Sequence, residues 1–274
     1  MIKLIAVDMD GTFLTTQKTY DHARFAKIFA QLTARKIKFV VASGNQFAQL
    51  ASFFPAYPEL TYVAENGALI FDQGKLIHEN HFDPQTVCEL IQFLRQEHPN
   101  VNMVLNGLKG AYLEKSAPEE FKKIVYFYCH ALELVDDLLE TAAGAEKYVR
   151  FALGVPEEKT EVIAKEISGE FAGKAAAVSS GHGNVDIILP NKHKANALQV
   201  LAARWQIKPE EIMAFGDGHN DLEMLRYAGH SYAMANGAPA VKAAARYQAP
   251  SNDHHGVLDV IERYLQSAGS CNDN

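Results

Sequence analysis

The sequence predicts an α/β protein with a doubly wound parallel sheet, into which a smaller α+β module is inserted. Short apolar runs of the kind that buried parallel strands use alternate with helical patterns at both ends of the chain. Between residues 83 and 187 this alternation of strand and helix patterns gives way to a predicted hairpin, followed by helix and strand units. The 274 residues are enough for two domains. We therefore expect a discontinuous core domain of residues 1–82 and 188–274 and an inserted cap domain of residues 83–187.

The first part of the chain predicts a βαβ unit. Residues 2–7 form an apolar run typical of a buried strand, and residues 37–42 form a second one. Between them, Asp21 can cap a helix whose apolar residues recur at helical spacing. Two further short apolar runs, 60–64 and 68–71, follow.

The insert is expected to begin with a helix that Asp83 caps and Pro84 starts. The next elements expected are a hairpin over 101–105 and 111–113, a helix from Pro118, a strand over 148–153, a helix from Pro156 and a strand over 185–189. The aromatic run 126–128 is expected to lie mostly in the core. After Pro190 strand and helix patterns alternate again, with helices expected over 194–205 and 221–227 and strands over 212–215 and 231–234.

Composition excludes several classes of function. The formal charge of −7 comes with no basic run, which argues against a nucleic-acid partner. No apolar stretch approaches the roughly 18 residues of a membrane span, and the N-terminal apolar run is too short for a secretory signal. Three widely separated cysteines, Cys88, Cys129 and Cys271, favour a reducing compartment over a disulfide framework or a zinc cluster. We expect a cytoplasmic protein, with a monomer as the default.

The most informative residues are two acids at the end of the first strand, in Asp8-Met9-Asp10-Gly11-Thr12. Open α/β sheets bind ligands at the carboxyl ends of their strands. A carboxylate there can attack phosphorus, and a second one can give a proton to the leaving oxygen and take one from water. Alone, such a pair is equally consistent with an ordinary acidic loop.

Two other segments supply groups that could bind phosphate. Ser43 and Gly44 follow the second strand and offer a hydroxyl and backbone amides. Lys194 begins a predicted helix, an unfavourable place for a cation unless an anion lies nearby. Lys192, two residues earlier, is an alternative to it.

The segment Gly216-Asp217-Gly218-His219-Asn220-Asp221 predicts a metal site. It places two acids and an amide around a glycine turn after an apolar strand. Mg²⁺ prefers such oxygen ligands and typically takes one or two carboxylates, keeping several waters. Asp8 and Asp217 would supply those carboxylates. A simple helix cap is the alternative for this segment alone.

These four segments together resemble the four motifs of the haloacid dehalogenase (HAD) superfamily of Mg²⁺-dependent phosphohydrolases. The first, second and fourth motifs match residues 8–12, Ser43 and residues 216–221, and Lys194 matches the third. The insert is similar to the type IIB cap of the Cof-type branch, and several segments are similar to a sugar phosphatase of that branch. The resemblance implies a Rossmann-like core with an α+β cap.

The resemblance also implies a role for each matching residue. Asp8 would be the nucleophile and Asp10 the general acid and base, with the Asp10 carbonyl on the metal. Asp217 would be the remaining protein ligand of Mg²⁺. Asp221 would orient the waters on the metal, or Lys194, without binding the metal directly. Further residues would hold the phosphoryl group, namely Ser43, Gly44, Lys194 and Asn220. The second motif departs from the pattern, because Asn45 stands where many relatives have an arginine.

We therefore predict a Mg²⁺-dependent phosphatase of small phosphorylated metabolites, with sugar phosphates as the expected class, acting through an aspartyl-phosphate. A sugar phosphomutase and a non-catalytic sensor of a phosphometabolite are the alternatives. In the cap, the loop 179–184 is expected to face the substrate, and His182 could read the hydroxyls of a sugar. The alternative is that this loop merely joins two strands.

Overall fold

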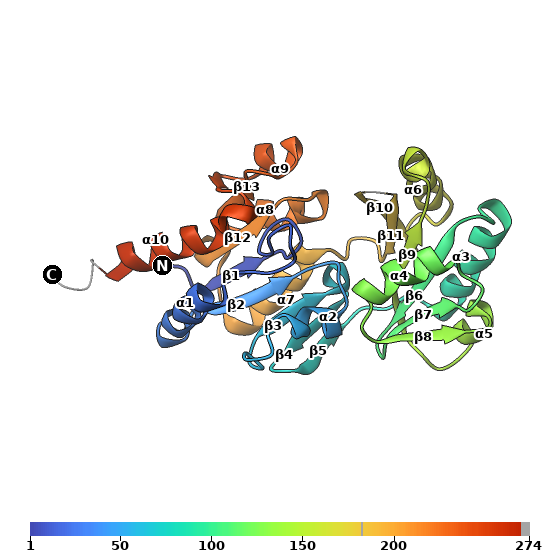
Figure 1. The fold of residues 1–274 in the computed structure, drawn as a ribbon, viewed down its shortest axis with the longest axis horizontal. Helices are drawn as coiled ribbons and strands as arrows, with labels where there is room; N and C mark the ends of the chain where they lie inside the picture. Colours follow the sequence, from blue (N-terminus) through green and yellow to red (C-terminus); the bar gives the residue numbers. More distant parts are fainter. Residues whose placement is uncertain (182, 270–274) are drawn as a thin grey trace.

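The protein folds around two separate β-sheets, here called the large sheet and the small sheet (Figure 1). The computed structural model describes residues 1–181 and 183–269. The large sheet has eight strands in the order β14-β13-β12-β1-β2-β3-β4-β5. Its strands are β1 (Leu4–Val7), β2 (Lys38–Ala42), β3 (Thr61–Ala64), β4 (Leu69–Asp72), β5 (Lys75–Glu79), β12 (Ile212–Gly216), β13 (His230–Met234) and β14 (Tyr247–Ala249).

The small sheet has six strands in the order β10-β11-β9-β6-β7-β8. These are β6 (Asn102–Gly107), β7 (Ala111–Glu114), β8 (Leu132–Val135), β9 (Tyr148–Gly154), β10 (Ala176–Gly181) and β11 (Asn184–Ile188). The helices are α1 (His22–Ala34), α2 (Phe47–Ser52), α3 (Pro84–Glu97), α4 (Glu119–Tyr128), α5 (Leu138–Ala142), α6 (Thr160–Glu170), α7 (Lys194–Trp205), α8 (Leu222–Tyr227), α9 (Pro239–Ala244) and α10 (Gly256–Gly269).

The large sheet is doubly wound. Its strands from β14 to β3 run parallel, and β4 and β5 add an antiparallel edge. Successive side chains of a strand point to opposite faces, so Ile5 packs with α1 and α10 residues while Leu4 and Ala6 pack with α7 and α8 residues. Both faces are therefore covered by helices, as a parallel sheet requires.

The small sheet also buries both faces. Leu105 and Phe151 pack in one cluster with apolar residues of α3, α5 and α6. Val104 lies on the opposite face, in a second cluster with Val125 of α4. This second face is turned toward the large sheet, with α4 close to α2 in Figure 1. The arrangement places the ends of β1, β2 and β12 opposite the small sheet.

The predicted fold class is confirmed: a parallel α/β sheet carries an inserted α+β module. Every strand of the large sheet lies within residues 4–79 or 212–249, and every strand of the small sheet within 102–188. The division into a core of 1–82 and 188–274 and a cap of 83–187 stays a prediction, which this separation supports. Among the described residues, no helix is long and apolar enough to cross a membrane.

One expectation about packing was wrong. The aromatic run 126–128 of α4 does not lie in the core, because Tyr126 and Phe127 are about half exposed. The helix instead buries Val125 against the small sheet. Position 128 contributes to the cavity described below. A run of consecutive aromatic residues points in several directions around a helix, so it cannot all be buried on one face.

Candidate active site

Asp8 and Asp217 come together because they follow adjacent parallel strands. β1 pairs with β12 so that Val7 lies opposite Phe215, and each acid follows its strand at the same edge of the sheet. Gly11 lets the loop after β1 lie close to Asp217, since a Cβ atom at position 11 would overlap the Asp217 carboxylate. Its φ of +78° is also one that side-chain-bearing residues rarely adopt.

Lys194 is the central cation of the site. It is fully buried at the first turn of α7, and its Nζ lies 2.6 Å from Asp8 Oδ1 and 2.7 Å from Asp221 Oδ1. The other oxygen of Asp221 accepts hydrogen bonds from the backbone N–H groups of Asp217 and Gly218, both at 3.0 Å. Asp221 therefore holds both Lys194 and the loop after β12 in place.

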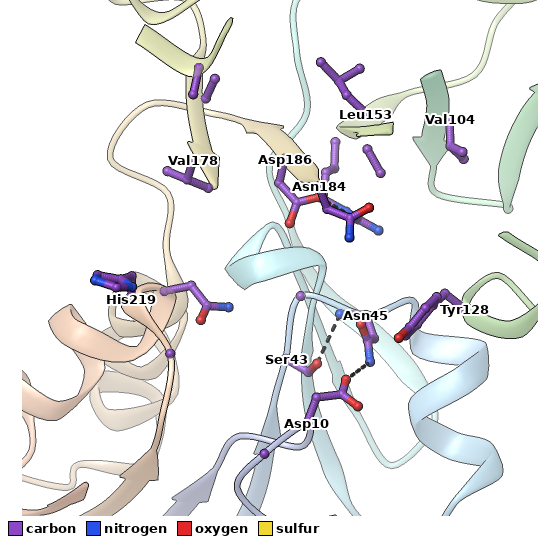
Figure 2. A pocket seen from close by; sticks show the side chains of 18 of the residues that line it. Asp10, Ser43, Asn45, Val104, Tyr128, Leu153, Val178, Asn184, Asp186 and His219 are labelled. Atoms are coloured by element: carbon purple, nitrogen blue, oxygen red, sulfur yellow. Dashed lines mark hydrogen bonds and ion pairs between the residues drawn. The ribbon is translucent and has the colours of Figure 1, made fainter. Parts of the chain in front are cut away.

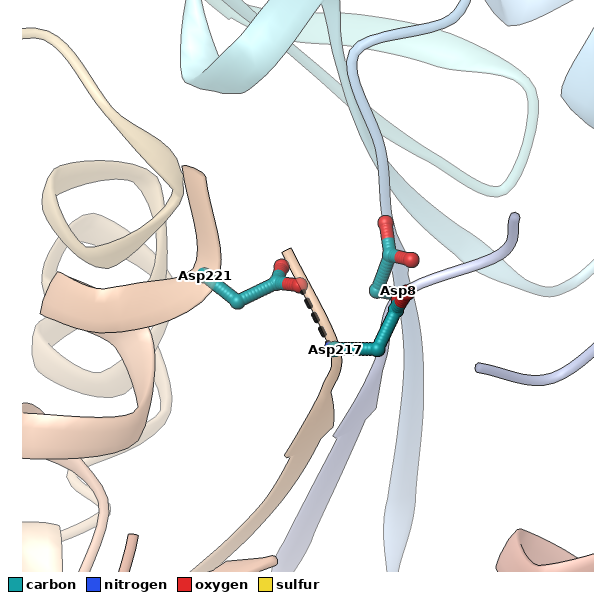
Figure 3. Close-up of side chains that lie close together, drawn as sticks. All are labelled: Asp8, Asp217 and Asp221. Atoms are coloured by element: carbon teal, nitrogen blue, oxygen red, sulfur yellow. Dashed lines mark hydrogen bonds between the residues drawn. The ribbon is translucent and has the colours of Figure 1, made fainter. Parts of the chain in front are cut away.

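The three acids Asp8, Asp217 and Asp221 form one cluster, shown in Figure 3. A carboxylate oxygen from each lies within 4.8 Å of the others. Burial raises the pKa of Asp8 well above its usual value, and although Lys194 opposes this, the other two acids add to it. Burial, and then the charge of Asp221, raise the pKa of Asp217 to about 6, while a hydrogen bond from Thr12 opposes the rise.

The charge balance of this cluster leaves room for a cation. Three carboxyl groups face one ammonium, Lys194, so ionisation of all three would leave the site with an excess of negative charge. Buried charge without compensation is costly. Hard oxygen donors at this spacing suit Mg²⁺, which favours carboxylate and carbonyl ligands. The residues present therefore fit a divalent metal ion.

Asp10 lies on the cavity side of the cluster and has two partners of its own. Lys18 Nζ forms an ion pair with Asp10 Oδ1, and Asn45 Nδ2 donates a hydrogen bond of 2.7 Å to Asp10 Oδ2. Asn45 also donates its backbone N–H to Ser43 Oγ at 3.1 Å. Figure 2 shows both hydrogen bonds of Asn45, with Asp10 and Ser43 pointing toward the same space. The ends of β1 and β2 thus form one polar wall.

These walls enclose a cavity of about 1260 Å³ between the two sheets. The large-sheet side is polar and includes Asp8, Asp10, Lys18, Ser43, Gly44, Asn45, Asp217 and Asn220. The small-sheet side carries apolar groups from Val104, Tyr128, Leu153 and Val178 beside the polar Asn184 and Asp186 (Figure 2). The cavity can thus hold a phosphate at one end and a larger organic group at the other.

A buried ionic bridge in the wall of this cavity connects the two sheets. Arg150 of β9 donates to Glu65 and, at 2.6 Å, to Asp186 of β11. Asn66, next to Glu65, donates to Asp186 at 3.4 Å and accepts a hydrogen bond of 3.1 Å from Asn220. The bridge therefore reaches from the small sheet to the loop after β12.

The structure brings together the sequence-predicted residues of the four motifs. Asp8, Lys194, Asp217 and Asp221 meet in the buried cluster. The others, Asp10, Ser43, Gly44 and Asn220, line the same cavity. Lys192 instead lines a separate surface depression. His182 lies outside the described residues.

Sequence reasoning assigned no role to Lys18, Glu65 or Arg150. Arg150 carries a signal that could have been used, because it is a lone charge inside a strand that otherwise reads as buried. Lys18 has no such signal, since it follows the first motif in an ordinary polar loop. Its place beside Asp10 depends on how that loop returns to the sheet.

Comparison with known proteins agrees with this geometry. Residues 5–261 match the family described as haloacid dehalogenase-like hydrolases. The chain belongs to this HAD-like hydrolase family. It is 42% identical over 268 residues to the 5-amino-6-(5-phospho-D-ribitylamino)uracil phosphatase YbjI of Escherichia coli, an alignment that covers 97% of each chain.

Solved structures of other proteins show the same architecture. The crystal structure of SMU.1108c from Streptococcus mutans matches with a TM-score of 0.92 and 42% identity, covering 97% of this chain and 100% of that one. The HAD subclass IIB sugar phosphatase BT4131 matches in fold, with a TM-score of 0.81 at 22% identity over 96% of this chain and 98% of that one. The doubly wound HAD core with an inserted module is thus shared along almost the whole chain.

Proposed function

We propose that this HAD-like hydrolase is a Mg²⁺-dependent phosphatase of small phosphorylated metabolites that acts through an aspartyl-phosphate on Asp8. The observation that carries the proposal is the buried contact of Lys194 with Asp8 at the cavity floor. The ammonium holds the carboxylate in one orientation and offsets charge as a phosphate approaches. Membership of a hydrolase family and the similarity to a phosphatase give further support.

The proposed reaction uses Asp8 and Asp10 in two steps. An oxygen of Asp8 forms a bond to phosphorus while the bond from phosphorus to the leaving oxygen breaks. That oxygen keeps the bonding pair and takes a proton from the Asp10 carboxyl group. Water then attacks phosphorus and gives its proton to Asp10, and the bond to Asp8 breaks. Phosphate is released and both acids return to their starting states.

Other residues would bind the transferring group. Ser43, Gly44 and Asn220 line the cavity around it and offer hydroxyl, backbone and amide donors. Asp8, Asp217 and the main-chain carbonyl of Asp10 would hold Mg²⁺, which fits the oxygen donors and the excess negative charge. The bound ion would supply positive charge opposite the phosphoryl oxygens.

For the organic part of the substrate, we propose sugar and sugar-alcohol phosphates as the class. Polar groups of Asn184 and Asp186 at the small-sheet end of the cavity support a leaving group with hydroxyls. A phosphate of a ribitylamino-pyrimidine is a second candidate within this class of esters. The 42% identity to YbjI favours it, and so does Tyr128, which offers apolar surface to a flat ring.

The test is phosphate release from a panel of phosphorylated metabolites, measured with Mg²⁺ and with a chelator. The panel includes hexose, pentose and ribitol phosphates and 5-amino-6-(5-phospho-D-ribitylamino)uracil. We expect metal-dependent release that is lost in Asp8→Asn, which keeps the shape of the side chain but removes its charge. Release that persists in Asp8→Asn would overturn the assignment of the nucleophile.

The same panel separates the alternatives. A phosphomutase would convert a sugar phosphate to its isomer when supplied with a bisphosphate, with little phosphate released. A sensor would bind members of the panel without turning them over. The cytoplasmic location and the monomeric state expected from the sequence stay predictions, which cell fractionation and light scattering would test.

A further inference from the structure

The Asp10 carboxylate is held from two sides by groups that come from different loops. Lys18 Nζ contacts Oδ1, and Asn45 Nδ2 donates to Oδ2 at 2.7 Å. Both residues line the cavity, so the pair of contacts lies where a substrate would enter. A carboxylate gripped through both oxygens has one orientation available to it, because rotation about its terminal torsion would break both contacts.

The loop that carries Lys18 is itself fixed. The backbone N–H of Lys18 donates to Thr15 O at 2.8 Å, and Lys18 has a φ of +56°, which points to a tight, specified turn. Asp253 accepts hydrogen bonds from the backbone N–H and the hydroxyl of Thr16, at 2.7 and 2.9 Å. Asn252 Nδ2 donates to Leu14 O at 2.9 Å. The C-terminal part of the large-sheet region therefore anchors this loop.

Asp10 retains capacity for a substrate despite these contacts. An ionised carboxylate has about four lone-pair sites, two on each oxygen. One contact on each oxygen leaves sites free to carry a proton and to face another oxygen. Lys18 likewise has three donors, and its contact with Asp10 uses one of them. The arrangement can thus hold Asp10 still without blocking it.

We propose that Lys18 and Asn45 are positioning residues that aim the Asp10 carboxyl group at the oxygen of the leaving group. The inference rests on the proposed function, since it assigns a task to the acid of that reaction. Holding a catalytic group in the reactive geometry is worth much more than the stability of an exposed ion pair. Lys18 and Asn45 therefore act on the chemical step through Asp10.

The test uses two esters that differ in how much they need an acid. The alcohol of ribose 5-phosphate must be protonated as it leaves, whereas the phenolate of p-nitrophenyl phosphate leaves without a proton. The ratio kcat/KM reports the steps through release of the leaving group, so it isolates this difference. A variant that misaligns Asp10 should be slow with ribose 5-phosphate and nearly normal with p-nitrophenyl phosphate.

We expect Lys18→Met and Asn45→Ala each to lower kcat/KM for ribose 5-phosphate at least about tenfold more than for p-nitrophenyl phosphate, within the roughly 10²- to 10⁴-fold that general acid catalysis contributes. Lys18→Arg, which keeps the charge, should recover part of the loss. Lys3→Met is the matched control, because Lys3 pairs with Glu211 at 2.7 Å away from the cavity. It should leave both esters unchanged.

An equal loss for both esters, or no loss for either, in Lys18→Met and Asn45→Ala would overturn the inference and leave the proposed function intact. Asn45→Ala keeps the test decisive if Lys18→Met does not fold. Failure of the proposed function looks different: the wild-type protein would then release no phosphate in the presence of Mg²⁺ from either ester or from any member of the panel, and both proposals would fall.

Discussion

Arg150 of β9 forms an ion pair with Glu65 of the turn after β3, and both side chains are almost fully buried. This pair joins the small sheet to the large sheet, and Asp186 shares the same guanidinium at 2.6 Å. The turn that carries Glu65 also packs against the start of α7, since a Cβ atom at Gly67 would lie 2.5 Å from His193 O. A substitution that breaks this bridge should therefore disturb the position of the neighbouring Lys194.

Removal of Arg150 should destabilise the protein. Arg150→Met leaves Glu65 and Asp186 buried without their cation, and breaking a buried pair costs about 3–5 kcal/mol. Urea unfolding followed by circular dichroism would measure the change. Lys115→Met is the control, because its pair with Asp136 is exposed and should contribute no more than about 1 kcal/mol. Equal effects of the two substitutions would contradict the importance of the bridge.

Stabilisation by Mg²⁺ should depend on pH. In the metal-free protein the pKa of Asp217 is raised to about 6, chiefly by burial. The stability contributed by its proton is complete below the unfolded pKa and is lost as the pH rises through about 6. Above that pH the ionised Asp217 adds negative charge to the acidic cluster, and a bound cation would relieve the resulting repulsion.

We therefore expect Mg²⁺ to raise the Tm more at about pH 7.5 than at about pH 5. Thermal unfolding with MgCl₂ and with a chelator at both pH values would measure this. Asp217→Asn removes the titrating group, and it should reduce both the Mg²⁺ effect and its dependence on pH. The same Tm increase at the two pH values would contradict the prediction.

The side chain of Gln46 should protect a backbone amide of the small-sheet region from exchange. Gln46 accepts a hydrogen bond of 2.9 Å from Ala131 N–H and donates one of 3.2 Å to Ala131 O. These bonds cross from the start of α2 to the segment after α4. Gln46→Ala removes both, so the amide of Ala131 should exchange faster by hydrogen–deuterium exchange.

Gln31→Ala, on the exposed side of α1, is the control for that experiment and should leave exchange at Ala131 unchanged. If Gln46→Ala also leaves the exchange rate unchanged, the contact does not hold the two regions together in solution.

Cys129 should be unreactive in the folded protein. Its side chain is 6% exposed, and burial raises the pKa of the thiol to about 11, although Arg150 opposes the shift. Alkylation needs the thiolate, so little of the reactive form is present at about pH 8. Peptide mapping after treatment with iodoacetamide should find Cys129 unmodified in native protein and modified in urea. Full modification without urea would show that the site opens readily.

The sequence by itself determined the class of fold and most of the candidate site. The alternation of apolar runs and helical patterns predicted the parallel sheet, because buried strands and amphipathic helices each need their own spacing of apolar residues. The positions of Asp8, Ser43 and Asp217 after such runs predicted that they would share one edge, since parallel strands end together. Lys194 was a candidate because of its unfavourable place at a helix start, and the resemblance to the HAD superfamily favoured it over Lys192.

Only the tertiary structure decided which groups surround these residues. Lys18 meets Asp10 because a loop anchored by Asp253 turns back over the sheet. Arg150 meets Glu65 because the two sheets face each other across the cavity, and their residues are far apart in the chain. Periodicity reports the local structure of each segment, but contacts between distant segments depend on how the packed layers are placed. For that reason the candidate site residues could be predicted from the sequence, whereas the contacts of Lys18, Glu65 and Arg150 could not.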